Sequence, residues 1–152
     1  MAVYFLKRRQ VVPGDMATVF SFFENPMNLE MITPPWMHFK VLSSTDNSVR
    51  KNTRISYRIR WLIFPMIWKS RISEYEENSF FVDEMMQGPY KTWYHRHLFS
   101  TVRGGIEITD LVKYELPFGL LGDLVHSILI RKQLEKIFNH RNEAIAKIFG
   151  PG

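Results

Sequence analysis

The chain has 152 residues, of which 45% are apolar and 14% aromatic, and its formal net charge is +5. This length suits one domain, residues 1–152, that buries roughly 70% of the surface its unfolded form exposes. Because the chain has no cysteine, disulfides, thiolate metal ligands and a cysteine nucleophile are excluded. The cations are spread along the chain without a long run of like charges, so we expect no nucleic-acid partner.

The two most apolar terminal segments do not have the pattern of an export signal or a membrane span. A few apolar residues precede Lys7, Arg8 and Arg9, whereas a secretory signal has the basic residues first. The apolar stretch at residues 120–130 contains Asp123 and is far shorter than the roughly 20 residues that cross a bilayer. We therefore expect a cytoplasmic protein without a transmembrane segment.

The N-terminal part of the chain predicts one strand and two short helices. Residues 2–12 are rich in β-branched and aromatic residues and end at Pro13-Gly14, which is typical of a strand followed by a turn. Asp15 stands where a helix cap is expected, and apolar residues then recur at helical spacing until Pro26. Residues 27–32 are expected to form a second short helical turn.

The middle of the chain has a hydrophobic period of two, which predicts an antiparallel meander. The expected strands are residues 39–43, 52–62, 67–75, 79–87, 91–101 and 105–115. Gly88-Pro89 and Gly104-Gly105 supply turn residues, and Phe64-Pro65 is expected to break the chain between the second and third of these strands.

The C-terminal part returns to a helical period, with a long apolar stripe from Leu121 to Phe149. Leu124 and Ile128 belong to this stripe and are expected to face the core. A helix of this length spans roughly 40 Å, which is enough to cross the concave side of a twisted sheet. Gly150-Pro151-Gly152 is a stop signal. The pattern predicts an α+β fold in which a seven-stranded curved antiparallel sheet wraps around the C-terminal helix.

Several motifs resemble a known superfamily. They are Asn28-Leu29-Glu30-Met31-Ile32-Thr33-Pro34-Pro35-Trp36, Phe81-Val82-Asp83, Gly88-Pro89-Tyr90, Trp93 with His95, His97 and Phe99, Thr109-Asp110, and Tyr114-Glu115-Leu116-Pro117-Phe118-Gly119. With the order of the elements, they are similar to the START and polyketide cyclase superfamily, and most of all to its bacterial ligand-binding SRPBCC proteins. The resemblance covers nearly the whole chain. It implies the helix-grip fold of the birch-pollen allergen and a cavity between sheet and long helix that holds apolar molecules, but it implies no single reaction.

Strand parity predicts which side chains line this cavity, because alternate residues face the same side of a sheet. The residues expected to line it are Trp36, Phe39, Tyr57, Ile59, Trp61, Trp68, Phe81, Asp83, Met85, Trp93, His95, His97, Phe99, Asp110, Val112, Tyr114, Leu124, Ile128 and Phe138. The opposite parity leaves Arg54, Arg58, Arg60, Lys69 and Arg71 on a basic convex face.

Four of the predicted cavity residues are polar and titratable: Asp83, His95, His97 and Asp110. Buried polar groups need hydrogen-bond partners, so one interpretation is that these groups satisfy one another, with Tyr57 nearby. A second is recognition of a polar group on a ligand. A third is catalysis, with a histidine as general acid or base. No metal site or cofactor is predicted, because no HxxxH, HExxH or cysteine pair accompanies the histidines.

Two further features fall outside the sheet. The segment from Pro34 to Phe39 is stiff and bulky, and it is interpreted either as a rim of the cavity or as a packing corner. Arg131, Lys132 and Arg141 on the long helix are expected to be solvated, although Arg141 lies near the apolar stripe and is a candidate clamp for an acidic ligand.

The favoured function is binding or carriage of a largely apolar small molecule. One alternative is a cyclase, dehydratase or hydrolase in which His95 or His97 acts near a reactive carbon. Another is an interaction module that docks on a membrane or an acidic protein through the basic convex face. The sequence leaves the oligomeric state open.

Overall fold

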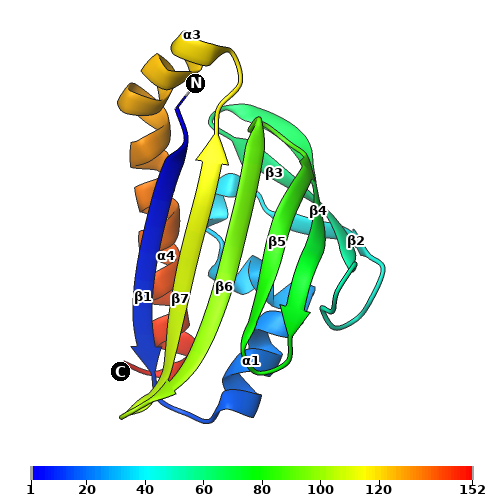
Figure 1. Cartoon of the computed structure of the whole chain (residues 1–152), viewed down its shortest axis with the longest axis vertical. Helices are drawn as coiled ribbons and strands as arrows, with labels where there is room; N and C mark the ends of the chain where they lie inside the picture. Colours follow the sequence, from blue (N-terminus) through cyan, green and yellow to red (C-terminus); the bar gives the residue numbers. More distant parts are fainter. Residues whose placement is uncertain (1, 152) are drawn as a thin grey trace.

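The computed structural model describes residues 2–151, in which a seven-stranded antiparallel sheet curves around a long C-terminal helix (Figure 1). Met1 and Gly152 lie outside the described residues, so the expected domain ends and the Gly152 part of the stop signal do too. The α+β class and the helix-grip architecture predicted from the sequence are confirmed. None of the helices in residues 2–151 has both the length and the apolar character that crossing a membrane requires.

The sheet is an open meander in which the first strand pairs with the last and forms one edge. Its strands are β1 Tyr4–Val12, β2 Lys40–Ser44, β3 Arg54–Trp61, β4 Phe64–Glu76, β5 Phe80–Gln87, β6 Thr92–Val102 and β7 Gly105–Glu115. The spatial order is β1-β7-β6-β5-β4-β3-β2, so β1 pairs with the last strand and β2 forms the other edge. Every pairing is antiparallel.

The helices lie between strands 1 and 2 and after strand 7. The first group is α1 Met16–Glu24, the short turns η1 Pro26–Asn28 and η2 Pro35–Met37, and between them α2 Leu29–Ile32. The second group is α3 Gly119–Val125, the π-helical turn η3 His126–Ile130 and α4 Arg131–Phe149. The predicted cap is present, because the Asp15 side chain accepts a hydrogen bond of 2.8 Å from the backbone of Thr18. The long helix begins at Gly119, slightly earlier than expected.

The expected break at Phe64-Pro65 is wrong. Both residues belong to β4, and the chain turns instead at Leu62 and Ile63, where Leu62 has a φ of 55°. Pro65 pairs with Arg60 close to the end of the hairpin. A proline is tolerated there because few ladder hydrogen bonds remain to be lost.

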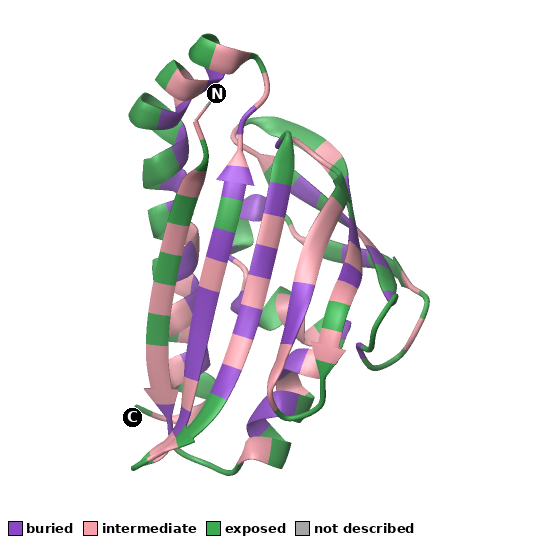
Figure 2. Ribbon diagram, in the orientation of Figure 1, coloured by how far each residue is buried: buried purple, intermediate pink, exposed green. Residues whose placement is uncertain are grey.

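The core lies between the concave face of the sheet and the helices. The sheet contributes buried side chains such as Ile55, Ile72 and Ile108, and α1 and α4 contribute Phe20 and Phe138. Figure 2 shows buried and half-buried residues alternating along β6, as the period of two requires. The same alternation leaves Arg54, Arg58 and Arg60 exposed on the convex face.

In the first half of the C-terminal helix, the residues that face inward are not those of the predicted apolar stripe. Leu121, Leu124 and Ile128 are exposed, whereas Gly122, His126 and Ile130 are buried. His126 is held by Tyr114, whose hydroxyl lies 2.7 Å from its Nε2 atom. The predicted inward orientation of Leu124 and Ile128 is therefore wrong, because the polar anchor at His126, rather than hydropathy, sets which face of this helix lies inward.

The β6–β7 turn offers a matched test of backbone packing. Gly104 and Gly105 both have positive φ, but a Cβ at Gly104 would meet open space, whereas one at Gly105 would overlap the backbone carbonyl of Val12. Gly104→Ala is expected to cost about 1 kcal/mol of the free energy of unfolding, and Gly105→Ala at least about 1 kcal/mol more. Urea denaturation of both variants measures the difference, and equal costs would contradict the close approach of β1 to this turn.

Candidate functional site

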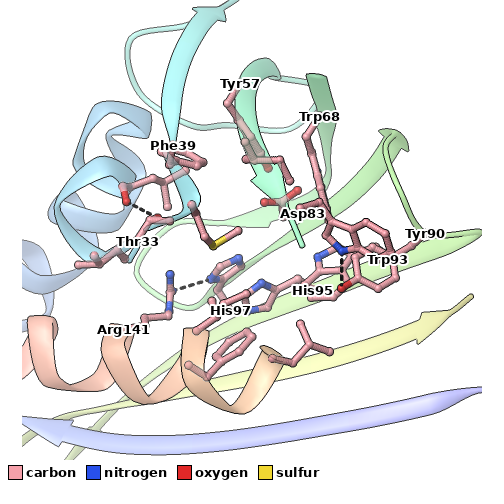
Figure 3. Close-up of a pocket in the computed structure, with 18 residues that line it drawn as sticks. Thr33, Phe39, Tyr57, Trp68, Asp83, Tyr90, Trp93, His95, His97 and Arg141 are labelled. Carbon is pink, nitrogen blue, oxygen red and sulfur yellow. Dashed lines mark hydrogen bonds between the residues drawn. The ribbon is translucent and has the colours of Figure 1, made fainter. Parts of the chain in front are cut away.

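A cavity of about 140 Å³ lies between the sheet and α4, closed at one side by α2 and η2. Ten of the side chains predicted to line it do so: Phe39, Tyr57, Ile59, Trp61, Trp68, Asp83, Trp93, His95, His97 and Phe138. Figure 3 shows Asp83, His95, His97 and Arg141 gathered between the aromatic rings of the wall. The cavity is thus mainly apolar, with a small polar cluster.

Nine other predicted residues do not line this cavity. Phe81, Phe99, Val112 and Tyr114 pack in the core, Met85 is half-buried on β5, and Asp110 is buried and hydrogen-bonded to His95. Trp36, Leu124 and Ile128 are exposed. Pro34 to Phe39 combines both sequence interpretations, since Met37 and Phe39 line the cavity while Trp36 projects outward.

The polar cluster is centred on Asp110 of β7. One carboxylate oxygen, Oδ1, lies 2.8 Å from His95 Nε2 and 3.4 Å from Arg141 Nη2. His97, which pairs with Asp110 across the β6–β7 ladder, has its Nδ1 3.5 Å from the same Arg141 nitrogen. Asp110, Arg141 and both histidines are all less than a tenth exposed. The cluster therefore joins two neighbouring strands to the helix.

The buried carboxylate remains charged. Burial by itself would raise the pKa of Asp110, but the Arg141 guanidinium and the hydrogen bond from His95 outweigh burial and hold this pKa well below its usual range. A buried charge with a paired counter-charge is tolerated, whereas the same charge alone is costly. Asp110 and Arg141 thus depend on each other.

His97 is neutral, and its two neighbours at Nδ1 favour opposite tautomers. Burial, His95 and Arg141 hold the pKa of His97 well below its ordinary value, against the opposing effect of Asp110. We infer that Nδ1 accepts from Arg141 at 3.5 Å rather than donates to Asp110 Oδ1 at 3.6 Å, and this assignment places the ring proton on Nε2. Within residues 2–151 this Nε2 is buried without a hydrogen-bond partner, as is Nε of Arg141. Two unpaired donors therefore belong to residues that line the cavity.

A second polar group lies across the cavity on β3, β4 and β5. Ser70 donates to Asp83 at 2.6 Å, and its hydroxyl also lies 2.9 Å from the Tyr57 hydroxyl and accepts from Trp68 at 3.2 Å. Burial raises the pKa of Asp83, opposed by the Ser70 hydrogen bond and by His95 and Arg141. This group is largely satisfied internally, but the partner of Asp83 is Ser70, which the sequence interpretation did not name.

His95, His97 and Asp110 are the groups that could hold a metal ion, since their ligand atoms lie within 4.8 Å of one another. Arg141 contacts the same Asp110 oxygen and the same His97 ring. Its positive charge would repel a divalent cation at that position. The arrangement fits an arginine–carboxylate pair better than a metal site.

Arg141 is the main site residue that sequence reasoning placed in solvent, and that expectation is wrong. It lies seven residues after Leu134, three after Phe138 and four before Ile145, all buried on α4. This spacing places it on the inward face of a helix. The spacing was a usable signal, but the partner that makes burial possible, Asp110, lies far away in the sequence.

Removing the carboxylate charge tests the pair. Asp110→Asn leaves Arg141 as a buried charge without its partner and is expected to cost about 3–5 kcal/mol of stability. Since the folded pKa of Asp110 lies below its unfolded value, the pair stabilises the fold above the unfolded pKa and is lost as pH falls. Wild type should therefore lose stability below about pH 5, and the variant should lack that component. Urea midpoints across pH measure this, with Glu135→Gln as the exposed control.

The state of His97 is accessible to NMR. Its ring is expected to remain neutral, with the proton on Nε2, well below pH 6.5, which is the ordinary value for histidine. Because the folded pKa is lowered, the stabilisation present above pH 6.5 declines as pH falls below it. Long-range proton–nitrogen spectra identify the tautomer. A ring protonated on both nitrogens at neutral pH would contradict the interpretation.

No known family model and no curated protein sequence matches this chain. Solved structures that resemble it include the di-domain ARO/CYC StfQ from the steffimycin biosynthetic pathway, with 13% identity and a TM-score of 0.73 over 97% of this chain and 50% of that chain. This chain therefore spans half of that protein.

Two further solved structures match over nearly the full length of both chains. Major latex-like protein 151 from Panax ginseng has 13% identity and a TM-score of 0.71, covering 98% of this chain and 99% of that one. Ara h 8.0201 has 13% identity and a TM-score of 0.59, covering 95% and 99%. At such identities the likeness shows the fold alone, and that fold is the helix grip.

Proposed function

We propose that the cavity binds a largely apolar small molecule whose hydrogen-bond-accepting group, such as a carbonyl, lies against His97 and Arg141. The observation that carries this proposal is the pair of buried donors, His97 Nε2 and Arg141 Nε, that have no partner within residues 2–151. Buried donors left unpaired are costly, and a ligand acceptor would satisfy them once the side chains that cover both atoms shift to admit it. The aromatic and aliphatic lining suits the remainder of the molecule.

The volume of the cavity limits the size of the ligand. A void of about 140 Å³ is close to the roughly 150 Å³ that holds a benzene-sized molecule in a protein interior. A single-ring compound fits the cavity as it stands. A larger ligand would extend out of the cavity, which is partly open to solvent, or would displace α2 and η2, which close one side of it.

The similar structures support the proposal at the level of fold only. A sheet that curves around one helix leaves room for a ligand between them, and the ARO/CYC name of one neighbour applies to that protein. The identity of the ligand rests on the polar cluster of this chain.

Acid–base catalysis is a second candidate, and one observation favours it. Asp110 holds Nε2 of His95, a residue that lines the cavity, at 2.8 Å. A carboxylate that orients an imidazole is the usual arrangement for a general acid or base. His95→Gln would separate the two functions, because it should retain ligand binding and abolish turnover of any compound that the wild type converts.

Two single-ring probes test the binding proposal. Acetophenone carries a carbonyl and ethylbenzene, which is nearly the same size, carries none. Acetophenone is expected to bind about fivefold more tightly, the value of one net hydrogen bond of about 1 kcal/mol. His97→Phe keeps the ring stack with Phe81 and His95 and should remove this preference. Chemical-shift titration measures all four affinities.

Variants that fill the cavity test whether the two probes bind inside it. Ile59→Trp from the sheet and Ile137→Trp from the helix should each abolish binding of both probes, since both positions line the cavity. Ile67→Trp lies at an exposed position of β4 and should leave it unchanged. Unaltered binding in folded Ile59→Trp and Ile137→Trp proteins would place the probes elsewhere and refute the proposal.

A further inference from the structure

One end of the molecule exposes an unusual number of large apolar side chains. Six lie in the segment that starts the C-terminal helix, and we call them the apolar end: Phe118, Leu120, Leu121, Leu124, Ile128 and Leu129. Leu120 is 87% and Phe118 81% exposed. Figure 1 shows α3, which carries three of them, at the extremity of the molecule beyond the strand ends. Contiguous apolar surface of this kind usually marks an interaction site.

Neighbouring elements extend this surface. Leu62 of the β3–β4 turn shares one surface groove with Phe118 and Leu121, and a second groove with Trp36, Ile128 and Leu129. The next two residues, Ile63 of that turn and Phe64 at the start of β4, are exposed as well. The apolar surface is therefore built from three separate parts of the chain.

The orientation of the helix is fixed, so the exposure is not the result of a loose segment. Gly122 packs so closely on the backbone of Pro117 that a Cβ would overlap its carbonyl oxygen. His126 is stacked on Tyr4 at 3.5 Å between ring centroids and hydrogen-bonded to Tyr114. Tyr4 in turn donates to Asp123 at 2.7 Å. These contacts hold one face of the helix inward and therefore hold Leu121, Leu124 and Ile128 outward.

Cations border the apolar end on its helical side. Lys132 and Lys136 line the groove that contains Trp36, Ile128 and Leu129, and Arg131 beside them is exposed. Glu135 is the exposed acid among them, and Asp123 is engaged by Tyr4. In sequence, Leu120, Leu124, Ile128, Lys132 and Lys136 recur every four residues, so an exposed row of the helix changes from apolar to basic.

We propose that the apolar end docks on an anionic lipid bilayer, with residues 118–129 and the β3–β4 turn in the interfacial region and Lys132 and Lys136 against the headgroups. An apolar face bordered by lysines is the pattern of interfacial insertion, and anionic headgroups attract cations close to the membrane surface. The net charge of +5 supports the approach to such a surface.

A second copy of the chain fits this surface less well. A two-fold dimer places the same patch against itself, and Glu135 is the exposed acid among the cations of that patch, so the patch offers the lysines of the other copy little complementary charge. Like charges across an interface oppose association, whereas anionic headgroups complement them. Charge complementarity therefore favours the bilayer.

The docking surface adjoins the ligand cavity but does not depend on it. Met37, Trp61, Leu134 and Ile137 line the cavity, and their chain neighbours Trp36, Leu62, Gln133 and Lys136 line the groove. The inference goes beyond the proposed function, since vesicle binding can be measured without any ligand. Ile59→Trp, which fills the cavity and leaves the apolar end intact, should bind vesicles like the wild type.

Vesicle flotation tests the proposal. The protein is expected to float with vesicles of equal parts phosphatidylcholine and phosphatidylglycerol at low salt, and at least tenfold less with phosphatidylcholine alone or at high salt. Leu120→Gln/Leu124→Gln should reduce binding at least tenfold, because both side chains are exposed and their loss leaves the core intact. The matched control is Met27→Gln/Leu42→Gln, which removes two exposed apolar side chains that share a groove elsewhere on the surface.

A second experiment reverses the charge of the two lysines that border the apolar end. Lys132→Glu/Lys136→Glu should reduce binding to the mixed vesicles, whereas Lys51→Glu/Arg103→Glu, with the same net charge and exposed positions in other loops, should not. Failure of the wild type to float, or equal flotation of Leu120→Gln/Leu124→Gln, would overturn the proposal. A dimer in sedimentation velocity that Leu120→Gln/Leu124→Gln abolishes, without vesicle binding, would assign the surface to a second copy instead.

Discussion

The ion pair between Asp110 of β7 and Arg141 of α4 is the constraint on which the rest of the structure depends. Both side chains are almost completely removed from water, so each is tolerable only in contact with the other. The pair fixes the rotation of α4 about its axis, because Arg141 must face the sheet. The faces that Phe138 and Leu134 present to the cavity follow from that rotation, and so does the position of the donor that defines the His97 tautomer.

A separate set of contacts, those of Gly122 and His126, accounts for the exposed apolar row, and the spacing of the inward residues accounts for the π turn. Inward residues of the long helix recur at Gly122, His126, Ile130, Leu134 and Phe138, at intervals of four. A regular helix has 3.6 residues per turn, so a row with a period of four drifts around its axis. A π turn holds more residues per turn and compensates for part of the drift, and η3 lies in the middle of this row. Hydropathy alone would have turned Leu124 and Ile128 inward.

The hydrophobic period of the sequence was sufficient to predict the fold, because each helix and strand repeats its apolar pattern over several residues. It predicted the order of the strands, the Asp15 cap and the inward parity of Tyr57, Ile59 and Trp68, which the structure places at the cavity. It failed where the position of a residue depends on one partner elsewhere in the chain. Arg141 was expected in solvent, although it lies near the apolar stripe, and the acid that makes its burial possible is 31 positions away. Phe64-Pro65 was expected to break the chain between two strands, but the place of Pro65 in a hairpin depends on the pairing partner Arg60.

The positions of the polar cluster and of the apolar end imply a preferred orientation for a ligand bound in the cavity. The unpaired donors belong to His97 and Arg141, whereas Trp61 lines both the cavity and a groove of the apolar end. A ligand held by its acceptor at the donors would have its apolar remainder toward Trp61, since burial of an aromatic ring there is favourable and burial of a second polar group is not. The apolar part would then be nearest the surface proposed to meet the bilayer.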